Sequence, residues 1–374
     1  MSNNCVHSHV GVSLVDASGK IRPCCKFKHG WDIPTLFDVE TLDNLHKRSE
    51  YATLQTELEN GNWPMPCRVC KRDESVGIFS RRLNTNRMFD THDLYTDGYI
   101  QDLEISLDFT CNMMCRMCAP GASSKWGAAA SVITDYKNNG IELDVQMDYK
   151  SYQDRFKYVF ERTDLSHARH LKIEGGEPFY AKHLEWFIDK LDREVIDKDK
   201  LYLSIFTNGS VFPDATIIEK LSRFKTTIIF SIDAYGDLAS CLRWGVRWEE
   251  VEQNIIKWSK LSDQFVMYTN ITVSILNVNA MKPLIDFCDA YGVHTQFSEL
   301  THPTYLSMYQ LPLSVRQQWA FDRTNFNEIL LADVSFDTQR DKLLKSTQLL
   351  DNYQGIKFAD VNPEMMEIID AYIR

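Results

Sequence analysis

Three cysteines, Cys111, Cys115 and Cys118, form a C-x3-C-x2-C spacing directly after an alternating apolar run over residues 103–109. Three thiolates on one short loop can converge on three irons of a [4Fe-4S] cube, which leaves the fourth iron open for another ligand. A structural zinc site is the alternative, but zinc sites usually close four ligands in paired Cys or Cys/His groups. No Cys or His follows Cys118 closely. The spacing therefore favours an iron-sulfur cluster.

Further polar positions follow the apolar runs along the chain. After the run 170–174 comes Gly175-Gly176-Glu177-Pro178. Glycines let a backbone pass close to a ligand, and Glu177 can accept from a cationic amino group. Taken alone, the motif also fits a plain turn from a strand into a helix, with Glu in the first helical turn.

The next two apolar runs also end on groups that can form hydrogen bonds. One ends Thr207-Asn208-Gly209 and the other ends Ser231-Ile232-Asp233, with Arg243 ten residues further on. Their ordinary local roles are turn and helix-cap chemistry. A surface arginine beside Trp244 is the ordinary interpretation of Arg243.

The segment Thr110–Cys118 resembles the cluster loop of radical S-adenosylmethionine (radical SAM) enzymes, and residues 175–178 match the GGEP motif of that family. The resemblance implies that SAM chelates the open iron through its amino and carboxylate groups. An electron then cleaves the sulfonium, and the 5′-deoxyadenosyl radical abstracts hydrogen from a substrate. The hard chemistry belongs to the cluster and SAM, while the protein supplies position and excludes water.

The resemblance also implies a set of SAM-binding residues. Glu177 would contact the amino group and Arg243 the carboxylate. Many members have an aromatic residue before the third cysteine, against the adenine; this chain has Met117, whose polarizable side chain can make a similar contact. The complete expected set is Gly175, Gly176, Glu177, Thr207, Asn208, Ser231, Asp233, Arg243 and Met117. Asn277 is a weaker candidate.

Five further cysteines lie within the first 70 residues. Cys5 is followed by Gly19 and then by Cys24-Cys25, and Gly19 suits a hairpin turn between strands at Val10–Val15 and Lys20–Pro23 that brings Cys5 and Cys24 together. Cys67 and Cys70 supply two more thiolates. Four cysteines can close one [4Fe-4S] cluster, although the same set also describes a four-cysteine zinc site.

The spacing C-x(9-15)-G-x4-C resembles the opening of the SPASM and twitch auxiliary-cluster domains. This resemblance implies a second [4Fe-4S] cluster held by Cys5, Cys24, Cys67 and Cys70, with Cys25 as the alternative to Cys24. Five cysteines are too few for two auxiliary clusters, so the single-cluster twitch form is the better match. In most relatives this domain follows the barrel, whereas here it precedes it.

The elements that must position these residues alternate between strands and helices from residue 102 onward, which is typical of βα units on a parallel sheet. The expected strands are Leu103–Asp108, His170–Glu174, Leu201–Thr207, Thr226–Ile232, Phe265–Leu276 and Val293–Leu300. Helical spacing covers His183–Asp192, Asp214–Phe224, Glu249–Leu261 and Met281–Tyr291. The fold class is therefore α/β, a partial (β/α)6 radical SAM barrel with its chemistry at the carboxyl ends of the strands.

Three domains are expected. Residues 1–90 form the small cysteine-rich hairpin and helix domain, with a helix near Leu42–Glu59, residues 91–310 form the barrel, and residues 311–374 form a helical extension that ends in a helix over Pro363–Ile373. Residues 138–168 are a polar insertion, a lid or extra helices.

Composition narrows the function classes. The 374 residues carry a net charge of −11, which disfavours broad binding to nucleic acid or to membranes because both are anionic. Ten cysteines and no long apolar run indicate a cytoplasmic protein with metal or redox chemistry. A local basic cluster could serve an anionic substrate, offset the charge of a cluster and its thiolates, or form a solvated face: Arg68, Lys71, Arg72, Arg81, Arg82 and Arg87.

These patterns favour a radical SAM enzyme of oxidoreductase type. The expected substrate is a peptide or protein side chain that is oxidised or cross-linked, and the alternative is a small metabolite resembling an aminoglycoside or a nucleotide. An electron donor such as flavodoxin or ferredoxin is the implied partner. A non-enzymatic iron-sulfur or zinc protein would account for the cysteines but not for the GGEP motif and the polar strand ends.

Overall fold

The structure is a computed structural model that describes residues 3–27, 30–75, 77, 79–89, 98–143 and 148–373. Two compact units divide the chain. The first comprises Met1–Phe109, Met147–Ile205 and Asp214–Thr226, and the second comprises Thr110–Gln146, Phe206–Pro213 and Thr227–Arg374. Each unit thus collects segments that are distant in sequence.

The first unit is built on parallel strands in the order β1-β2-β4-β5. Alternation along these strands separates two faces: Leu103 and Ile105 of β2 point to a fully buried apolar layer, whereas Glu104 between them lies on the opposite face. The strands are β1 (Gly11–Leu14), β2 (Asp102–Ser106), β4 (His170–Glu174) and β5 (Tyr202–Thr207).

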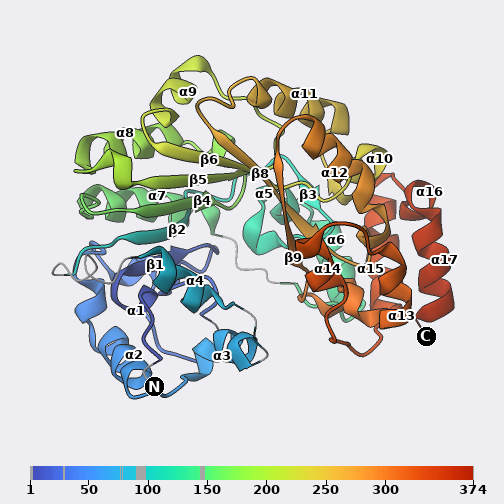
Figure 1. Cartoon of the computed structure of the whole chain (residues 1–374), viewed down its shortest axis with the longest axis horizontal. Helices are drawn as coiled ribbons and strands as arrows, with labels where there is room; N and C mark the ends of the chain where they lie inside the picture. The colour runs from blue at the N-terminus through green and yellow to red at the C-terminus, as the bar shows by residue number, and fades with distance from the viewer. Residues whose placement is uncertain are drawn as a thin grey trace. The chain divides into compact units, whose positions relative to one another are not determined.

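Two long helices cover the apolar face of this sheet, α7 (Tyr149–Arg162) and α8 (Leu184–Glu194), as Figure 1 shows. Their contact is aromatic. Phe156 stacks on Phe160 with ring centroids 4.2 Å apart, and Phe187 of α8 packs edge-on against Phe160 at 5.7 Å. All three side chains are fully buried, so this cluster anchors the helices to each other and to the strands.

The other helices of the first unit lie before β2 and after β4. Those before β2 are α1 (His7–Val10), η1 (Leu36–Asp38), η2 (Leu45–Lys47), α2 (Ser49–Glu59), η3 (Met65–Cys67), α3 (Arg68–Ser75) and α4 (Arg81–Met88). Those after β4 are η6 (Pro178–Tyr180), η7 (Lys198–Lys200) and α9 (Ala215–Leu221).

The predicted hairpin near the N-terminus is corrected in part. Gly19 does occupy a turn, with φ +65°, but residues 20–23 form no strand, only isolated antiparallel bridges of Arg22 with Ser13 and of Lys20 with Thr35. Gly11–Leu14 instead pairs in parallel with β2. The reason is burial: all four residues are buried, and β2 satisfies their backbone groups as a hairpin partner would. In the part of the chain that the structure describes, the parallel strands are therefore seven, one more than the six βα strands expected.

The second unit carries parallel strands in the order β6-β8-β9 and a small antiparallel pair, β3 with β7. The strands are β6 (Lys225–Phe230), β8 (Val266–Val273), β9 (His294–Glu299), β3 (Met114–Cys115) and β7 (Arg243–Trp244). The helices up to β9 are η5 (Pro120–Ala122), α5 (Ser124–Gly127), α6 (Ala130–Asn138), α10 (Gly236–Leu242), α11 (Trp248–Ser259), η8 (Val278–Ala280) and α12 (Met281–Ala290).

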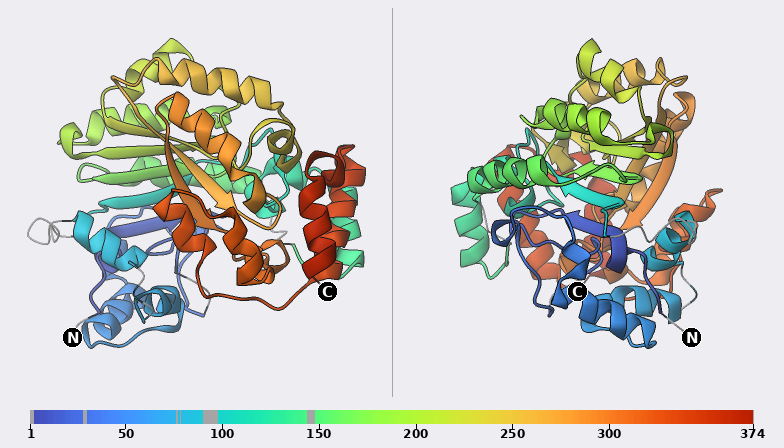
Figure 2. Two further views of the ribbon diagram at one scale, coloured as in Figure 1. Left: turned by 45° about the vertical axis from the view of Figure 1, so that its right-hand side comes forward. Right: turned by 90° about the vertical axis from the view of Figure 1, so that its left-hand side faces the viewer.

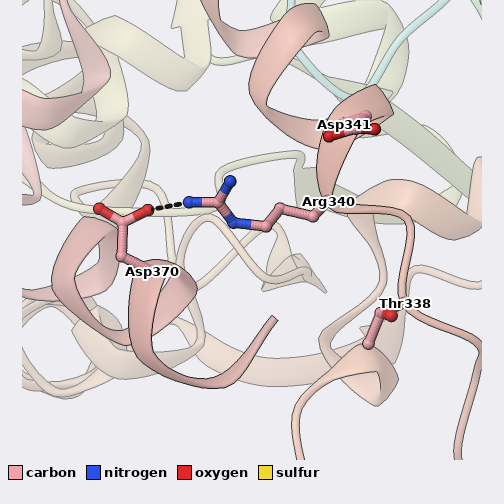
Figure 3. Close-up of a pocket in the computed structure, with 4 residues that line it drawn as sticks. All are labelled: Thr338, Arg340, Asp341 and Asp370. Atoms are coloured by element: carbon pink, nitrogen blue, oxygen red, sulfur yellow. Dashed lines mark hydrogen bonds and ion pairs between the residues drawn. The ribbon is translucent and has the colours of Figure 1, made fainter. Parts of the chain in front are cut away.

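The region after β9 is helical, as expected. It contains η9 (Thr304–Leu306), η10 (Met308–Gln310), α13 (Leu313–Arg316), η11 (Gln317–Trp319), α14 (Thr324–Leu330), α15 (Arg340–Gln354), α16 (Phe358–Val361) and α17 (Pro363–Tyr372). The last three helices lie side by side (Figure 2). Arg340 of α15 pairs with Asp370 of α17 at 2.5 Å across a polar surface hollow also lined by Thr338 and Asp341 (Figure 3).

The sequence predicted the elements well. All six expected strands and the four expected barrel helices are present within a few residues of their predicted bounds. The helix expected near Leu42–Glu59 is shorter, beginning at Ser49 after the 3-10 turn η2. The insertion 138–168 contributes α7, and its residues 144–147 lie outside the described residues.

The barrel closure and the three domain boundaries stay predictions, and the boundary at residues 90 and 91 falls outside the described residues. None of the helices in the described residues is both long enough and apolar enough to cross a membrane.

The buried imidazole of His46 makes the stability of the first unit depend on pH. Its Nε2 lies 2.9 Å from the carbonyl oxygen of Gly11, and burial lowers its pKa to about 4. The unfolded chain, with an ordinary pKa near 6.5, binds the proton first as the pH falls. We therefore predict a loss of up to about 3 kcal/mol of unfolding free energy between pH 6.5 and 4. Urea unfolding of wild type and His46→Gln measures it, and a wild-type pH slope in the variant would contradict it.

Candidate metal-cluster sites

The loop that carries Cys111, Cys115 and Cys118 is held by backbone contacts inside the second unit. Residues Met114 and Cys115 pair with β7, and the Cys118 amide donates to the Cys115 carbonyl at 3.1 Å. The indole of Trp126 also donates to the Cys115 carbonyl, at 2.8 Å. These contacts bend the eight residues from Cys111 to Cys118 into a compact loop, as ligation by three neighbouring thiolates requires.

A buried ion pair lies against this loop. Arg243 donates from Nε and Nη2 to one oxygen of Asp233, at 2.7 and 2.6 Å, and its Nη1 lies 3.8 Å from the Cys115 sulfur. Burial opposes the charge of Arg243, but the carboxylate of Asp233 outweighs it and raises the arginine pKa. Burial also raises the pKa of the Asp233 carboxyl. The Arg243 guanidinium and the Thr272 amide, which lies 2.8 Å away, lower this pKa in part. The contact geometry favours the charged pair.

Burial disfavours the thiolate form of two cysteines of this loop. Burial raises the pKa of Cys118 to about 11 and that of Cys115 further, although Arg243 opposes the rise at both. A thiolate ligand set at this position needs positive charge next to it. Cluster irons and the Arg243 guanidinium would both supply that charge, so the donor set and its surroundings fit an iron-sulfur cluster.

Asn208 lies at the first cysteine. Its Nδ2 donates to Asn112 Oδ1 at 2.9 Å and lies 4.0 Å from the Cys111 sulfur, while its Oδ1 accepts from the Ser210 amide. Thr207 accepts from the Gly209 amide, and its carbonyl accepts from the Ser231 amide at 2.7 Å. The turn hydrogen bonds predicted for Thr207 and Asn208 are therefore present. The same turn places Asn208 against the cluster loop.

A small cavity of about 10 Å³ opens beside these residues. It is lined by Met113, Asn208, Ile232, Ala239, Ser240, Arg243, Val246, Trp248 and Val251. Small-molecule sites span roughly 300 to 1,000 Å³, whereas this cavity has room for about one water molecule, so it does not by itself form a ligand site. Met117, predicted to lie against adenine, is partly exposed on the same loop and does not line this cavity.

The Gly-Gly-Glu motif belongs to the first unit, apart from the other predicted SAM residues, which belong to the second. Gly175 has φ +80°, and a Cβ on it would lie 2.0 Å from the Ser106 hydroxyl, so only glycine fits there. Glu177 is fully buried and caps η6, its Oε1 accepting from the Phe179 amide at 3.1 Å. The capping role is thus present, and the predicted contact of Glu177 with SAM stays a prediction.

Four N-terminal cysteines line one cavity of the first unit, with a volume of about 30 Å³. Cys5 precedes α1, Cys24 follows the bridge at Arg22, Cys67 ends η3 and Cys70 lies in α3. Burial raises the pKa of Cys5 and Cys67 to about 12 and that of Cys24 well above its usual value. Among the described residues, no group of three His, Cys, Asp or Glu is arranged to hold a single metal ion.

Cys24 and Cys25 have different surroundings. Cys24 lines the cavity, whereas Cys25 does not. The Cys25 amide donates to one oxygen of Glu104 at 2.9 Å, and its thiol donates to the other at 3.4 Å. Glu104 is 3% exposed and also accepts from Arg81 at 2.7 Å. This buried acceptor turns Cys25 away from the cavity, which favours Cys24 as the ligand.

The basic residues predicted near these cysteines divide into two groups. Arg82 lines the cavity, fixed by two contacts to Glu74 at 3.0 and 2.6 Å, and its charge lowers the pKa of Cys5 and Cys67 against the effect of burial. Arg72 instead forms an exposed pair with Asp73. Offsetting thiolate charge is therefore a role for Arg82, and a solvated face describes Arg72.

The sequence reasoning missed three residues that shape the cluster loop: Asn112, Arg116 and Gly245. Asn112 links Asn208 and Ser210. Gly245 has φ +128°, and a Cβ there would lie 2.3 Å from the Asn112 carbonyl. The first two lie inside the C-x3-C-x2-C segment, where their polar side chains could have been recognised as contacts of the loop. No local sequence signal marks Gly245 as a partner of the loop.

In the described chain no disulfide joins the ten cysteines.

No family model matches the chain, and no curated protein matches it. Solved structures do. It is similar to SuiB of Streptococcus suis bound to S-adenosylmethionine, with 14% identity and a TM-score of 0.39 over 76% of this chain and 63% of that one. It is also similar to native anSMEcpe with bound AdoMet and Cp18Cys peptide, with 18% identity and a TM-score of 0.37 over 57% and 55%.

A third similar structure is TYW1 with a lysine-pyruvate adduct bound, with 16% identity and a TM-score of 0.31 over 66% of this chain and 70% of that one. The chain thus spans less than two thirds of the length of SuiB and anSMEcpe. Because these TM-scores are all below 0.5, the similarity does not establish the family or the function of this chain.

The close approach at Gly245 gives a prediction. Gly245→Ala places a methyl group into the Asn112 carbonyl, whereas Gly236→Ala, also at positive φ (+63°), meets no atom within 4 Å. Backbone strain alone costs about 1–3 kcal/mol, so Gly245→Ala should destabilise the metal-free protein by at least about 2 kcal/mol more than Gly236→Ala. Urea unfolding of both variants tests this. Equal losses would mean that the loop yields to the methyl group at little cost.

Proposed function

We propose that this protein is a radical SAM enzyme, with a [4Fe-4S] cluster held by Cys111, Cys115 and Cys118. The observation that supports it most is the arrangement around these cysteines: the guanidinium of Arg243 lies 3.8 Å from one sulfur and the amide of Asn208 lies 4.0 Å from another. When bound, the cluster and SAM supply reductive cleavage of the sulfonium and hydrogen abstraction from the substrate.

The residues of this chain would bind and orient SAM. Arg243 would present its remaining donor to the SAM carboxylate while Asp233 fixes its plane, and Glu177 would accept from the amino group. Thr207, Asn208 and Ser231 lie at strand ends, where parallel βα folds gather their ligand contacts. Gly175 and Gly176 would let SAM approach the backbone, and Met117 would lie against the adenine.

We propose a second, auxiliary [4Fe-4S] cluster at Cys5, Cys24, Cys67 and Cys70, in a twitch-like N-terminal domain spanning residues 1–90. Four protein thiolates would close this cluster fully, which suits it to accept an electron from the substrate rather than to bind the substrate. Arg82 supports the site because it places a fixed positive charge at the thiols. A flavodoxin or ferredoxin would deliver the first electron.

The substrate class we propose to test first is a peptide or protein side chain, which would be oxidised or cross-linked. A small metabolite resembling an aminoglycoside or a nucleotide is the second class. The alternative is a zinc or iron-sulfur protein without enzymatic activity. This alternative gives no role to the polar strand ends or to the contact of Arg243 with Cys115. Metal analysis separates it from the enzyme.

The metal content gives a direct prediction. Anaerobically prepared protein should contain about eight iron atoms and about eight labile sulfides per chain, because two four-iron clusters have separate ligand sets. Replacing Cys111, Cys115 and Cys118 by Ala should halve both numbers. Cys288→Ala is the matched control, since Cys288 is a buried cysteine that lines neither of the two cavities, and it should keep the iron. Stoichiometric zinc without sulfide would overturn the proposal.

The two clusters should separate by role. Cys67→Ala with Cys70→Ala removes two ligands of the auxiliary cluster only, so reductant-driven release of 5′-deoxyadenosine should continue while product formation stops. Loss of a metal site can also unfold its domain. Circular dichroism and residual iron, expected near four per chain, must therefore be measured on the same sample. Product formation at the normal rate by a folded double variant would make the auxiliary site structural.

A further inference from the structure

The cluster loop is contacted from behind by the C-terminal end of α15. Arg116, between the second and third loop cysteines, is 3% exposed. Its Nη2 lies 2.7 Å from Asp351 of α15 and 3.0 Å from the carbonyl oxygen of Ile356. Its Nε donates to the Cys241 carbonyl at 3.2 Å. A loop residue is thus bound to a segment more than 230 positions later in the chain.

The turn after α15 is shaped to receive this arginine. Gly355 ends the helix in the left-handed region, with φ +72°, and its amide donates to the Asp351 carbonyl. The reversal brings the Ile356 carbonyl back toward Arg116, and the same Asp351 oxygen that meets Arg116 also accepts from the Phe358 amide at 3.1 Å. One carboxylate therefore joins the helix end, the following turn and the cluster loop.

A second contact reaches the loop one residue before Cys115. Gln354, the last residue of α15, is buried and donates from Nε2 to the Met114 carbonyl at 3.1 Å. Tyr353 contacts the ring of Trp244, which belongs to the strand paired with Met114 and Cys115, with ring centroids 5.9 Å apart. The helix end touches both strands of the β3–β7 pair.

We propose that residues 351–358 position the SAM cluster loop, and that Arg116 and Asp351 are its principal positioning residues. The proposal rests on the proposed function for the cluster, but the contacts are properties of the protein alone. A buried arginine without its carboxylate would be an uncompensated charge. Loss of Asp351 would therefore release Arg116 from its site and loosen the loop between Cys115 and Cys118. The C-terminal helices thereby become part of the cluster site.

Amide hydrogen exchange of the metal-free protein tests the loop directly. In the wild type the Arg116 amide donates to the Leu242 carbonyl and the Cys118 amide to the Cys115 carbonyl, so both are protected. Asp351→Asn keeps the shape and an acceptor for Phe358 but removes the charge. Exchange at Arg116 and Cys118 should become at least about tenfold faster. Asp341→Asn, in the first turn of the same helix, is the matched control and should leave both rates unchanged.

The amides of β8 distinguish local loosening of the loop from global unfolding. Their exchange rates in Asp351→Asn should equal those of the wild type. If these rates rise equally, Gln354→Met decides, because it removes one hydrogen bond and preserves size and burial. Faster exchange in the loop of either folded variant supports the proposal, and unchanged loop exchange in both overturns it.

The cluster-loaded protein supplies the second readout. The change that SAM produces in the electron paramagnetic resonance spectrum of the reduced cluster should be weaker in Asp351→Asn and restored toward wild type in Asp351→Glu. A full wild-type response in a variant whose loop exchanges faster would overturn the positioning role. If the wild type itself binds no cluster, the proposed function fails, and hydrogen exchange still decides whether the helix end holds the loop.

Discussion

The buried pair of Asp233 and Arg243 is the interaction on which the second unit depends. Asp233 directly follows the β6 region, and its side chain accepts from β8 through the Thr272 amide, while its carbonyl accepts from Asn277 at 2.8 Å. Arg243 continues the connection to Cys115. Neither charge could be buried alone. Because each compensates the other, the strand ends and the cysteine loop are held in one arrangement before any ligand binds.

In the first unit, other arginine–carboxylate pairs also place positive charge beside buried cysteines. Arg82 is oriented by Glu74 toward one group of thiols, and Arg81 is oriented by Glu104 beside Cys25. In both cases a carboxylate fixes the cation and the cation faces sulfur. A preorganised positive charge lowers the cost of forming thiolates in a buried site. The two cysteine groups are thus independent sites built on one electrostatic principle.

The sequence predicted what local pattern can encode. β4 has the predicted bounds, and the turn at Gly19 forms, because alternation and turn chemistry depend on neighbouring residues. The prediction for β1 was correct only in part: one antiparallel bridge joins Ser13 and Arg22, but the strand pairs in parallel with β2. Residue pattern alone does not distinguish these two pairings of a short buried strand. The contact of Arg116 with Asp351 and the choice of Cys24 over Cys25 depend on distant residues, Asp351 and Glu104, which spacing alone does not reveal.

The parallel pairing of β1 with β2 has a consequence for how the chain assembles during synthesis. Gly11 pairs with Asp102, a separation of 102 − 11 = 91 residues. At about 5–20 residues per second, a ribosome needs several seconds to make the second strand after the first. Throughout that interval β1 is an open edge, and Glu104, which separates Cys25 from Cys24, has not yet been made. The different surroundings of Cys24 and Cys25 are therefore established only when this sheet forms.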